Sequence, residues 1–259
     1  MLLEGKVALI SGGSRGIGAE TVRLFTKAGA RVVFSYRKAR NEAEALVREM
    51  GGPACCVAIE QELGSSADGQ ALVEAAMKAF GRLDILVANH GIWPPKDAPI
   101  AQMADAQWRH TMGVNLDSVF GLVRAAVAQF DRQGRPEPDE ASGHIVLISS
   151  TAGQRGEAYH ADYAVTKGAL ISLTKSLSSE LAPRGVRVNC VAPGWVSTEM
   201  SAGTLQDPVL GPRIAATIPL GRAARTGEIA GPVLFLCTPL AGFISGEVLN
   251  VNGGAVLVG

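Results

Sequence analysis

Short apolar runs alternate with longer stretches of helical periodicity along the chain. The runs are rich in Val, Ile and Leu and lack alternating polar residues, which is typical of strands covered on both faces. We predict strands at Val7–Ser11, Arg31–Ser35, Ala54–Ile59, Ile85–Ala88, His144–Ser149, Arg187–Val191 and Val248–Val251. We predict helices roughly at Gly16–Ala28, Asn41–Met50, Ser66–Phe80, Ala104–Phe130, Asp162–Ala182 and Thr226–Cys237.

This alternation implies right-handed crossovers between parallel strands. The expected fold class is α/β: a doubly wound (Rossmann) three-layer fold, with a seven-stranded parallel sheet and helices on both faces. A length of 259 residues suits one domain of this class, and we find no internal repeat or linker. We therefore predict a single domain over residues 1–259.

Two segments break the pattern. Asp131–Ser142 contains Gly, two Pro and four acidic residues, and we predict an exposed loop there. Trp195–Leu220 has scattered Gly and Pro with weak periodicity. Connections of that length in compact domains are usually functional or disordered, so we expect 195–220 to be the substrate loop.

Composition narrows the class of partner. The 24 basic and 24 acidic residues balance, which gives no reason to expect nucleic acid or an anionic membrane. The sequence has no long apolar run of the kind that anchors or exports a chain, so we expect a cytoplasmic protein. Apolar residues make up 47% of the chain, which suggests surface buried between subunits. The four cysteines lack CxxC spacing, so we expect buried or half-buried free thiols and no metal site.

A glycine-rich turn follows the first predicted strand and leads at once into a helix. Gly12, Gly16 and Gly18 have G-x-x-x-G-x-G spacing rather than the commoner G-x-G-x-x-G. Glycines at such a turn let the backbone approach a pyrophosphate, which the helix N-terminus attracts. The position predicts a dinucleotide site, with a ligand-free glycine turn as the alternative.

The end of the second predicted strand bears on the choice of dinucleotide. It reads Val33-Phe34-Ser35-Tyr36-Arg37 and lacks the acid that commonly binds the ribose hydroxyls of NAD. Arg37 and Arg15 instead offer guanidinium groups that suit a 2′-phosphate. We predict NADP(H) as the cofactor; the alternative is two solvated surface arginines.

Tyr163 and Lys167 lie four residues apart in a predicted helix, on one face. A neighbouring cation lowers the pKa of a phenol, so this pair can serve as a general acid–base. Ser150, at the end of the fifth predicted strand, faces the ligand crevice in this topology. Asn115, a poor helix former within a predicted helix, is a further catalytic candidate. The alternatives are a cap for Ser150 and a structural hydrogen bond for Asn115.

Taken in order, these motifs resemble the short-chain dehydrogenase/reductase family over the whole chain. Besides the glycine turn and the four catalytic candidates, the chain carries Asn89-His90-Gly91, Pro193-Gly194 and Asn252-Gly253-Gly254. It is similar in particular to the branch of 3-oxoacyl-carrier-protein reductases and glucose-dehydrogenase-like enzymes. The resemblance implies one dinucleotide-binding and catalytic domain, commonly assembled as a homotetramer.

The resemblance also implies residue roles. Tyr163 would transfer the proton, Ser150 would orient the carbonyl oxygen, and Lys167 would bind the nicotinamide ribose and lower the Tyr163 pKa. Asn115 would hold a water that relays protons to Lys167. Val196 would lie near the carboxamide and Thr198 near the phosphates. The implied cofactor-binding residues are Gly12, Ser14, Arg15, Gly16, Ile17, Gly18, Tyr36, Arg37, Glu62, Leu63, Asn89, Gly91, Tyr163, Lys167, Pro193, Gly194, Val196 and Thr198.

Some positions depart from the family pattern. Ser11 replaces a Thr and Asn252 replaces an Asp. Glu62 takes the place of an Asp that binds the adenine amino group, with Glu60 as a rival. His90 replaces a small residue, and we favour a structural role for it.

We therefore expect hydride transfer between NADP(H) and a small carbonyl or secondary alcohol, most simply by a ketoreductase. Trp93, Trp195 and Tyr159 would form an apolar substrate wall, unless they are ordinary packing. A carrier-protein substrate is the alternative, although Ser142 and Ser179 stand where such reductases often carry basic residues.

Two other classes remain open. A non-catalytic dinucleotide sensor would bind the cofactor without turnover. A nucleotide-sugar epimerase shares Tyr-x-x-x-Lys but usually has different glycine spacing and a larger C-terminal domain.

Overall fold

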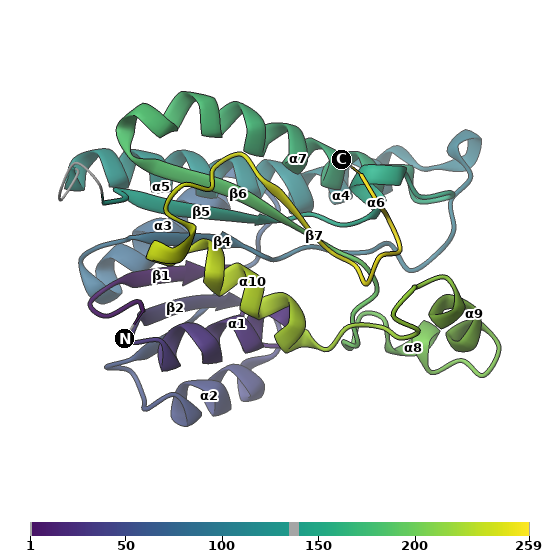
Figure 1. The fold of residues 1–259 in the computed structure, drawn as a ribbon, viewed down its shortest axis with the longest axis horizontal. Helices are drawn as coiled ribbons and strands as arrows, with labels where there is room; N and C mark the ends of the chain where they lie inside the picture. The colour runs from purple at the N-terminus through teal and green to yellow at the C-terminus, as the bar shows by residue number, and fades with distance from the viewer. Residues whose placement is uncertain (1, 135–139, 259) are drawn as a thin grey trace.

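The computed structural model describes residues 2–134 and 140–258. Its seven strands form one parallel sheet in the order β3-β2-β1-β4-β5-β6-β7, which confirms the predicted fold class (Figure 1). The strands are β1 (Val7–Ile10), β2 (Arg31–Tyr36), β3 (Cys56–Glu60), β4 (Ile85–Ala88), β5 (Gly143–Ile148), β6 (Val186–Pro193) and β7 (Val248–Val251). The order reverses beside β1, so the crevice between β1 and β4 is where this class of sheet binds ligands.

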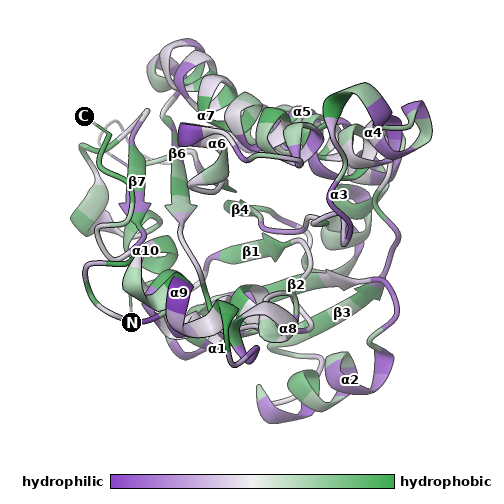
Figure 2. Cartoon of the chain, turned by 90° about the vertical axis from the view of Figure 1, so that its right-hand side faces the viewer, coloured by the Kyte–Doolittle hydropathy of each residue, from purple (hydrophilic) through white to green (hydrophobic). Residues whose placement is uncertain are grey.

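Helices cover both faces of the sheet, giving three layers (Figure 1). One face carries α1 (Gly16–Lys27), α2 (Arg40–Glu49) and α10 (Thr226–Leu236), and the other carries α3 (Ser66–Phe80), α5 (Ser118–Gln133) and α7 (Ala161–Leu181). Neighbouring strand residues serve opposite cores: Leu9 packs on the α3 side and Ile10 on the α1 side. This double burial is why the central strands lack polar alternation, and Figure 2 shows β1 as a hydrophobic strand between helices.

The predicted helix Ala104–Phe130 is not one regular α-helix. It consists of α4 (Asp105–Met112), a π-helical turn η2 (Gly113–Asp117) and α5, which continues to Gln133. The chain is crowded at this turn, since a Cβ on Gly113 would lie 2.5 Å from the Gly64 carbonyl oxygen. Single π-turns inside helices often mark functional sites.

Two short helices occupy the segment that we expected to be irregular, α8 (Ala202–Leu205) and α9 (Leu210–Ala216). The Asp207 carboxylate accepts hydrogen bonds from the amides of Val209 and Leu210, both at 2.8 Å, and so satisfies donors at the start of α9. Aspartate ahead of a helix is a recognised start signal, which the weak periodicity obscured.

The remaining connections hold shorter elements, α6 (Ala152–Arg155) and the 3₁₀ turns η1 (Ile100–Gln102), η3 (Ala182–Arg184) and η4 (Pro239–Ala241). Of the predicted loop Asp131–Ser142, residues 135–139 lie outside the described residues, and α5 extends into its start. Strand ends differ from the predicted ones by one or two residues, except in β4 and β7.

The cysteines are free thiols as expected: Cys56, Cys190 and Cys237 are buried and Cys55 is half-buried. Within the described parts of the chain, no helix is long and apolar enough to cross a membrane. The same residues contain no group of His, Cys, Asp and Glu side chains suited to hold a metal ion.

Candidate active site

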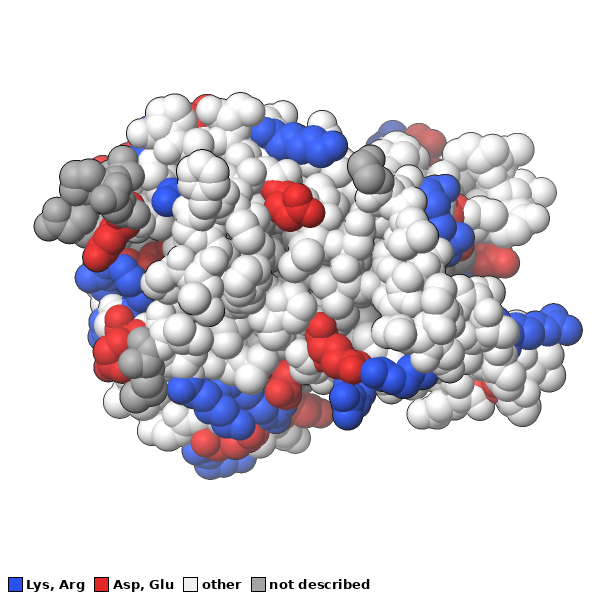
Figure 3. Space-filling model, in the orientation of Figure 1, with Lys and Arg blue, Asp and Glu red and all other residues white. Residues whose placement is uncertain are grey.

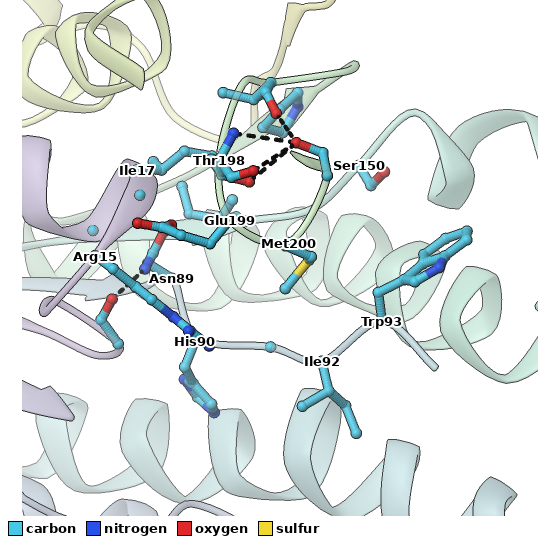
Figure 4. A pocket seen from close by; sticks show the side chains of 18 of the residues that line it. Arg15, Ile17, Asn89, His90, Ile92, Trp93, Ser150, Thr198, Glu199 and Met200 are labelled. Carbon is cyan, nitrogen blue, oxygen red and sulfur yellow. Dashed lines mark hydrogen bonds between the residues drawn. The ribbon is translucent and has the colours of Figure 1, made fainter. Parts of the chain in front are cut away.

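A cavity of about 870 Å³ runs along the carboxyl ends of the central strands. Its lining includes residues that follow β1, β2, β4, β5 and β6. Parallel strands bring their carboxyl ends to one edge of the sheet, so segments far apart in sequence meet there. Figure 4 shows Arg15 and Ile17 toward one end of this cavity and Trp93 toward the other.

The glycine turn forms one end of the cavity. Gly12 and Gly16 have φ angles of +67° and +56°, which side chains rarely adopt. A Cβ on Gly18 would lie 2.1 Å from the Gly12 carbonyl oxygen, so only glycine fits there. The Asn89 amide donates to the carbonyls of Ser11 (3.1 Å) and Gly12 (3.0 Å), which holds the turn against β4. The tight turn, the open cavity and the start of α1 fit a dinucleotide pyrophosphate.

Basic side chains gather where β2 ends. Arg15 and Arg37 both line the cavity, as the sequence predicted, and Lys38 and Arg40 join them. No acidic side chain ends β2, whose last residue is Tyr36. Lys38 and Arg40 were missed because they lie beyond the strand end, in the connection to α2 and at the first residue of α2, without recognisable spacing.

The structure does not place Glu62 in the cavity lining. Its side chain is 71% exposed and pairs with Arg37 at 3.5 Å. The rival Glu60 pairs with Arg40 and accepts a hydrogen bond from the Tyr36 hydroxyl. The neighbouring Gln61 and Leu63 line the cavity instead. Spacing alone misjudged which side chains face inward after β3.

Tyr163 and Ser150 face the same cavity from α7 and from the end of β5. Burial raises the pKa of Tyr163 to about 12, and a hydrogen bond with Ser150 acts in the opposite direction. The Glu157 carboxylate raises the same pKa further. The phenol is therefore protonated at neutral pH, as a proton donor must be.

Lys167 lies one helical turn beyond Tyr163 and is buried. Its ammonium donates to the Ile148 carbonyl oxygen (2.8 Å) and lies 5.6 Å from the centre of the Tyr163 ring. Burial lowers the pKa of Lys167 to about 8. The pKa of Tyr163 is raised rather than lowered in this structure, because desolvation of the phenol dominates; that Lys167 lowers it stays a prediction.

Asn115 lies in the π-turn η2, behind the cavity wall rather than in the lining. Its side chain accepts from the Ile92 amide (2.8 Å) and donates to the Ile92 carbonyl (3.0 Å) and to the Thr166 hydroxyl (3.3 Å). Asn115 thus ties the segment after β4 to α7. The structural hydrogen bonds that we weighed as its alternative role are present.

Apolar residues line the other end of the cavity. The Trp93 ring stacks on His160 with centroids 4.0 Å apart and meets the Tyr163 ring edge-on at 4.8 Å. Trp195 and Met200 complete this end, and Figure 4 shows Met200 between Trp93 and the glycine turn. Tyr159 does not belong to the wall, contrary to expectation: it is 56% exposed and outside the lining.

Sequence reasoning missed several residues of the cavity lining because nothing in their spacing signals a site. They are Ile92, Arg155, Glu157, Glu199 and Met200. The predicted residues that do line the cavity are Gly12, Ser14, Arg15, Gly16, Ile17, Gly18, Tyr36, Arg37, Leu63, Asn89, Gly91, Ser150, Tyr163, Lys167, Pro193, Gly194, Val196 and Thr198.

Comparison with known proteins places this arrangement in a family. Residues 12–256 match a family model described as enoyl-(acyl carrier protein) reductase. The chain is 36% identical to the 3-oxoacyl-[acyl-carrier-protein] reductase FabG of Escherichia coli, and each chain is covered completely.

Solved structures agree over the full length. A glucose/ribitol dehydrogenase-type short-chain dehydrogenase/reductase from Brucella melitensis superposes with a TM-score of 0.88 at 34% identity, covering 99% of both chains. A 3-ketoacyl-(acyl-carrier-protein) reductase from the same organism, complexed with NADH, superposes with a TM-score of 0.87 at 34% identity. The match covers 98% of this chain and 100% of that one. A blue fluorescent protein from a metagenomic library, complexed with NADPH, superposes with a TM-score of 0.88 at 33% identity. The match covers 99% of this chain and 100% of that one.

The whole-length identity to these proteins and the shared sheet order exclude a chance likeness. The chain belongs to the short-chain dehydrogenase/reductase family of oxidoreductases.

Proposed function

We propose that the protein is an NADP(H)-dependent ketoreductase, which interconverts a small carbonyl compound and its secondary alcohol. The observation that carries this proposal is the shared cavity: Ser150, Tyr163 and Lys167 line it together with the glycine turn. A group that transfers protons therefore lies within reach of a dinucleotide held by the turn. A sensor would have no use for a half-buried, protonated phenol at that place.

Each residue has a role that its surroundings support. The nicotinamide, when bound, supplies or accepts the hydride. Tyr163 donates its proton to the carbonyl oxygen during reduction, and Ser150 donates a hydrogen bond to the same oxygen. Lys167, anchored on the Ile148 carbonyl, directs its remaining ammonium protons toward the cavity.

NADP(H) rather than NAD(H) is supported by the charges at the β2 end. Arg15, Arg37 and Lys38 line the cavity where the adenosine ribose would lie, and β2 ends without an acid. Guanidinium groups there attract a 2′-phosphate through charge-assisted hydrogen bonds. One relative holds NADH and another NADPH, so the family permits either.

The substrate end favours a carbonyl compound with an apolar substituent. Trp93 and Met200 provide large apolar surfaces close to Tyr163. The two positions discussed for a carrier protein offer no positive charge: the Ser142 hydroxyl donates to the Arg184 carbonyl, and the Ser179 hydroxyl donates to the Lys175 carbonyl. We therefore propose a free small molecule as the substrate.

We also propose that the enzyme is a homotetramer in the cytoplasm. The β7 edge strand is unpaired on its outer side in the described sheet. The face over β7 and the C-terminal segment shows few charged side chains (Figure 3), and Leu240, Phe243 and Leu257 are strongly exposed near it. Light scattering at micromolar concentration checks this, and a monomer would contradict it.

The catalytic proposal is tested with Tyr163→Phe. The variant keeps the ring that packs on Trp93 but loses the acidic hydroxyl, so kcat/KM for a reactive ketone should fall about 10³-fold. Cofactor affinity, measured by calorimetry, should stay within twofold. The reaction is followed by NADPH absorbance with an apolar ketone, and NADH is run in parallel. Full turnover by the variant, or a preference for NADH, would contradict the proposal.

A further inference from the structure

The segment Asn89–Ile92 connects two parts of the site: the glycine turn and the π-turn η2, which carries Asn115. Asn89 holds the glycine turn, and the backbone of Ile92 is held by Asn115. Gly91 lies between them, where a Cβ would be 3.3 Å from Asn115 Oδ1 and 3.4 Å from Lys167 Nζ. The side chain of His90 contacts both parts at once: Ser11 beside the glycine turn, and Val114 and Ser118 around the π-turn.

His90 makes short contacts at both ring nitrogens. Nδ1 lies 2.7 Å from Ser11 Oγ, at the end of β1. Nε2 lies 3.0 Å from the Val114 carbonyl oxygen and 2.7 Å from Ser118 Oγ, on the two sides of Asn115. Figure 4 shows the ring pointing away from Ile17 and Thr198, toward the helical segment behind. His90 also abuts the turn itself, since a Cβ on Gly12 would lie 3.0 Å from the His90 Cα.

These partners assign one protonation state to the ring. The Val114 carbonyl only accepts, so Nε2 carries a hydrogen. Ser11 Oγ already accepts from the amides of Asn89 (3.0 Å) and His90 (3.3 Å), which uses both of its lone pairs. Its own hydrogen can go to the Val87 carbonyl at 3.4 Å or to Nδ1 at 2.7 Å, and we assign it to the shorter contact, which makes the imidazole neutral. Desolvation, and secondly the charge of Lys167, lowers the pKa of His90 to about 4, which also favours the neutral imidazole.

We propose that His90 is a positioning residue: as a neutral bridge, it fixes the glycine turn relative to the π-turn that carries Asn115. This inference rests on the proposed function, because the glycine turn and the π-turn must be correctly placed around the same bound cofactor. A small residue at this position would reach neither Ser118 nor the Ser11 hydroxyl. Misplacement of a reacting group by about 1 Å can cost up to 100-fold in rate, so the bridge acts on turnover without touching the substrate.

The matched variants are His90→Gln and His90→Phe. A Gln amide has one donor nitrogen and one acceptor oxygen, so it can replace both ends of the bridge. Phe fills the space but makes neither hydrogen bond. We expect His90→Phe to raise the Kd of NADPH about tenfold and to lower kcat about tenfold, each a loss near 1.4 kcal/mol. The KM of the carbonyl substrate should not change, and His90→Gln should stay within threefold of wild type in every constant.

The Kd is measured by calorimetry without substrate, and thermal unfolding confirms that each variant is folded. Ser118→Ala is a milder break of the same bridge and should raise the Kd of NADPH about threefold, which keeps the test decisive if His90→Phe does not fold. Wild-type Kd in both His90→Phe and Ser118→Ala overturns the proposal. Equal impairment of His90→Gln and His90→Phe also overturns it, because a rescue by Gln is what separates positioning from packing. If no carbonyl is turned over but the Kd pattern holds, only the proposed function fails.

Discussion

Arg37 illustrates how a single residue can carry a choice of cofactor. It lies directly after β2, lines the cavity and pairs only loosely with Glu62 at 3.5 Å. The guanidinium is half-exposed, which limits each contact it makes to a modest energy. Its effect should therefore appear as a difference between two cofactors rather than as loss of activity.

For Arg37→Ala we expect kcat/KM with NADPH to fall about tenfold, because one charge-assisted hydrogen bond is lost. The value with NADH should stay within twofold, since no 2′-phosphate is present. Steady-state kinetics with both cofactors provide the measurement. Arg23→Ala is the matched control, because Arg23 on α1 pairs with Glu49 on α2 and does not line the cavity. An equal loss with both cofactors would argue against a 2′-phosphate contact.

At the scale of elements, the segment from Trp195 to Leu220 differs most from expectation. It contributes Met200 to the substrate end of the cavity, and the Asp207 carboxylate accepts hydrogen bonds from the Val209 and Leu210 amides where α9 begins. A helix of seven residues is marginal by itself, so these hydrogen bonds and its packing hold it in place.

Replacing Asp207 by Ala should loosen this segment. Losing the hydrogen bonds to Val209 and Leu210 costs about 1 kcal/mol, so we expect the KM of the carbonyl substrate to rise about fivefold. The KM of the cofactor should change less, because Val196 and Thr198 are held separately by the Ser201 hydroxyl, ahead of α9. Asp207→Asn keeps an acceptor oxygen and serves as the control. If the Ala and Asn variants behave alike in steady-state kinetics, the hydrogen bonds of Asp207 do not organise the substrate end.

Across the whole molecule, two half-buried histidines, His90 and His144, connect stability to pH. Burial lowers the pKa of His90 and of His144 to about 4 from 6.5. The unfolded chain takes up these protons near pH 6.5, whereas the folded protein resists them until about pH 4. The free energy of unfolding is therefore highest above pH 6.5 and decreases as the pH falls through this window.

Between pH 7.5 and pH 5 we expect the free energy of unfolding to fall by about 2 kcal/mol for each histidine. Urea unfolding at each pH provides the measurement, through the shift of the midpoint. The lowered pKa values of Glu49 and Asp207 matter only below this range. His144→Gln, which cannot titrate, should remove about half of the pH dependence. A urea midpoint independent of pH between 7.5 and 5 would show that the folded protein does not lower the pKa values of these two histidines.

The sequence by itself determined the seven parallel strands, the glycine turn and the spacing of Tyr163 and Lys167. Double burial makes strands apolar, and helical spacing is local, so both leave a mark on neighbouring residues. Only the tertiary structure decided features that depend on contacts between distant segments. Packing against Gly64 accompanies the π-turn at Asn115, and side-chain direction after β3 excluded Glu62 from the cavity. Desolvation, which depends on everything around a group, set the pKa of Tyr163 above its usual value.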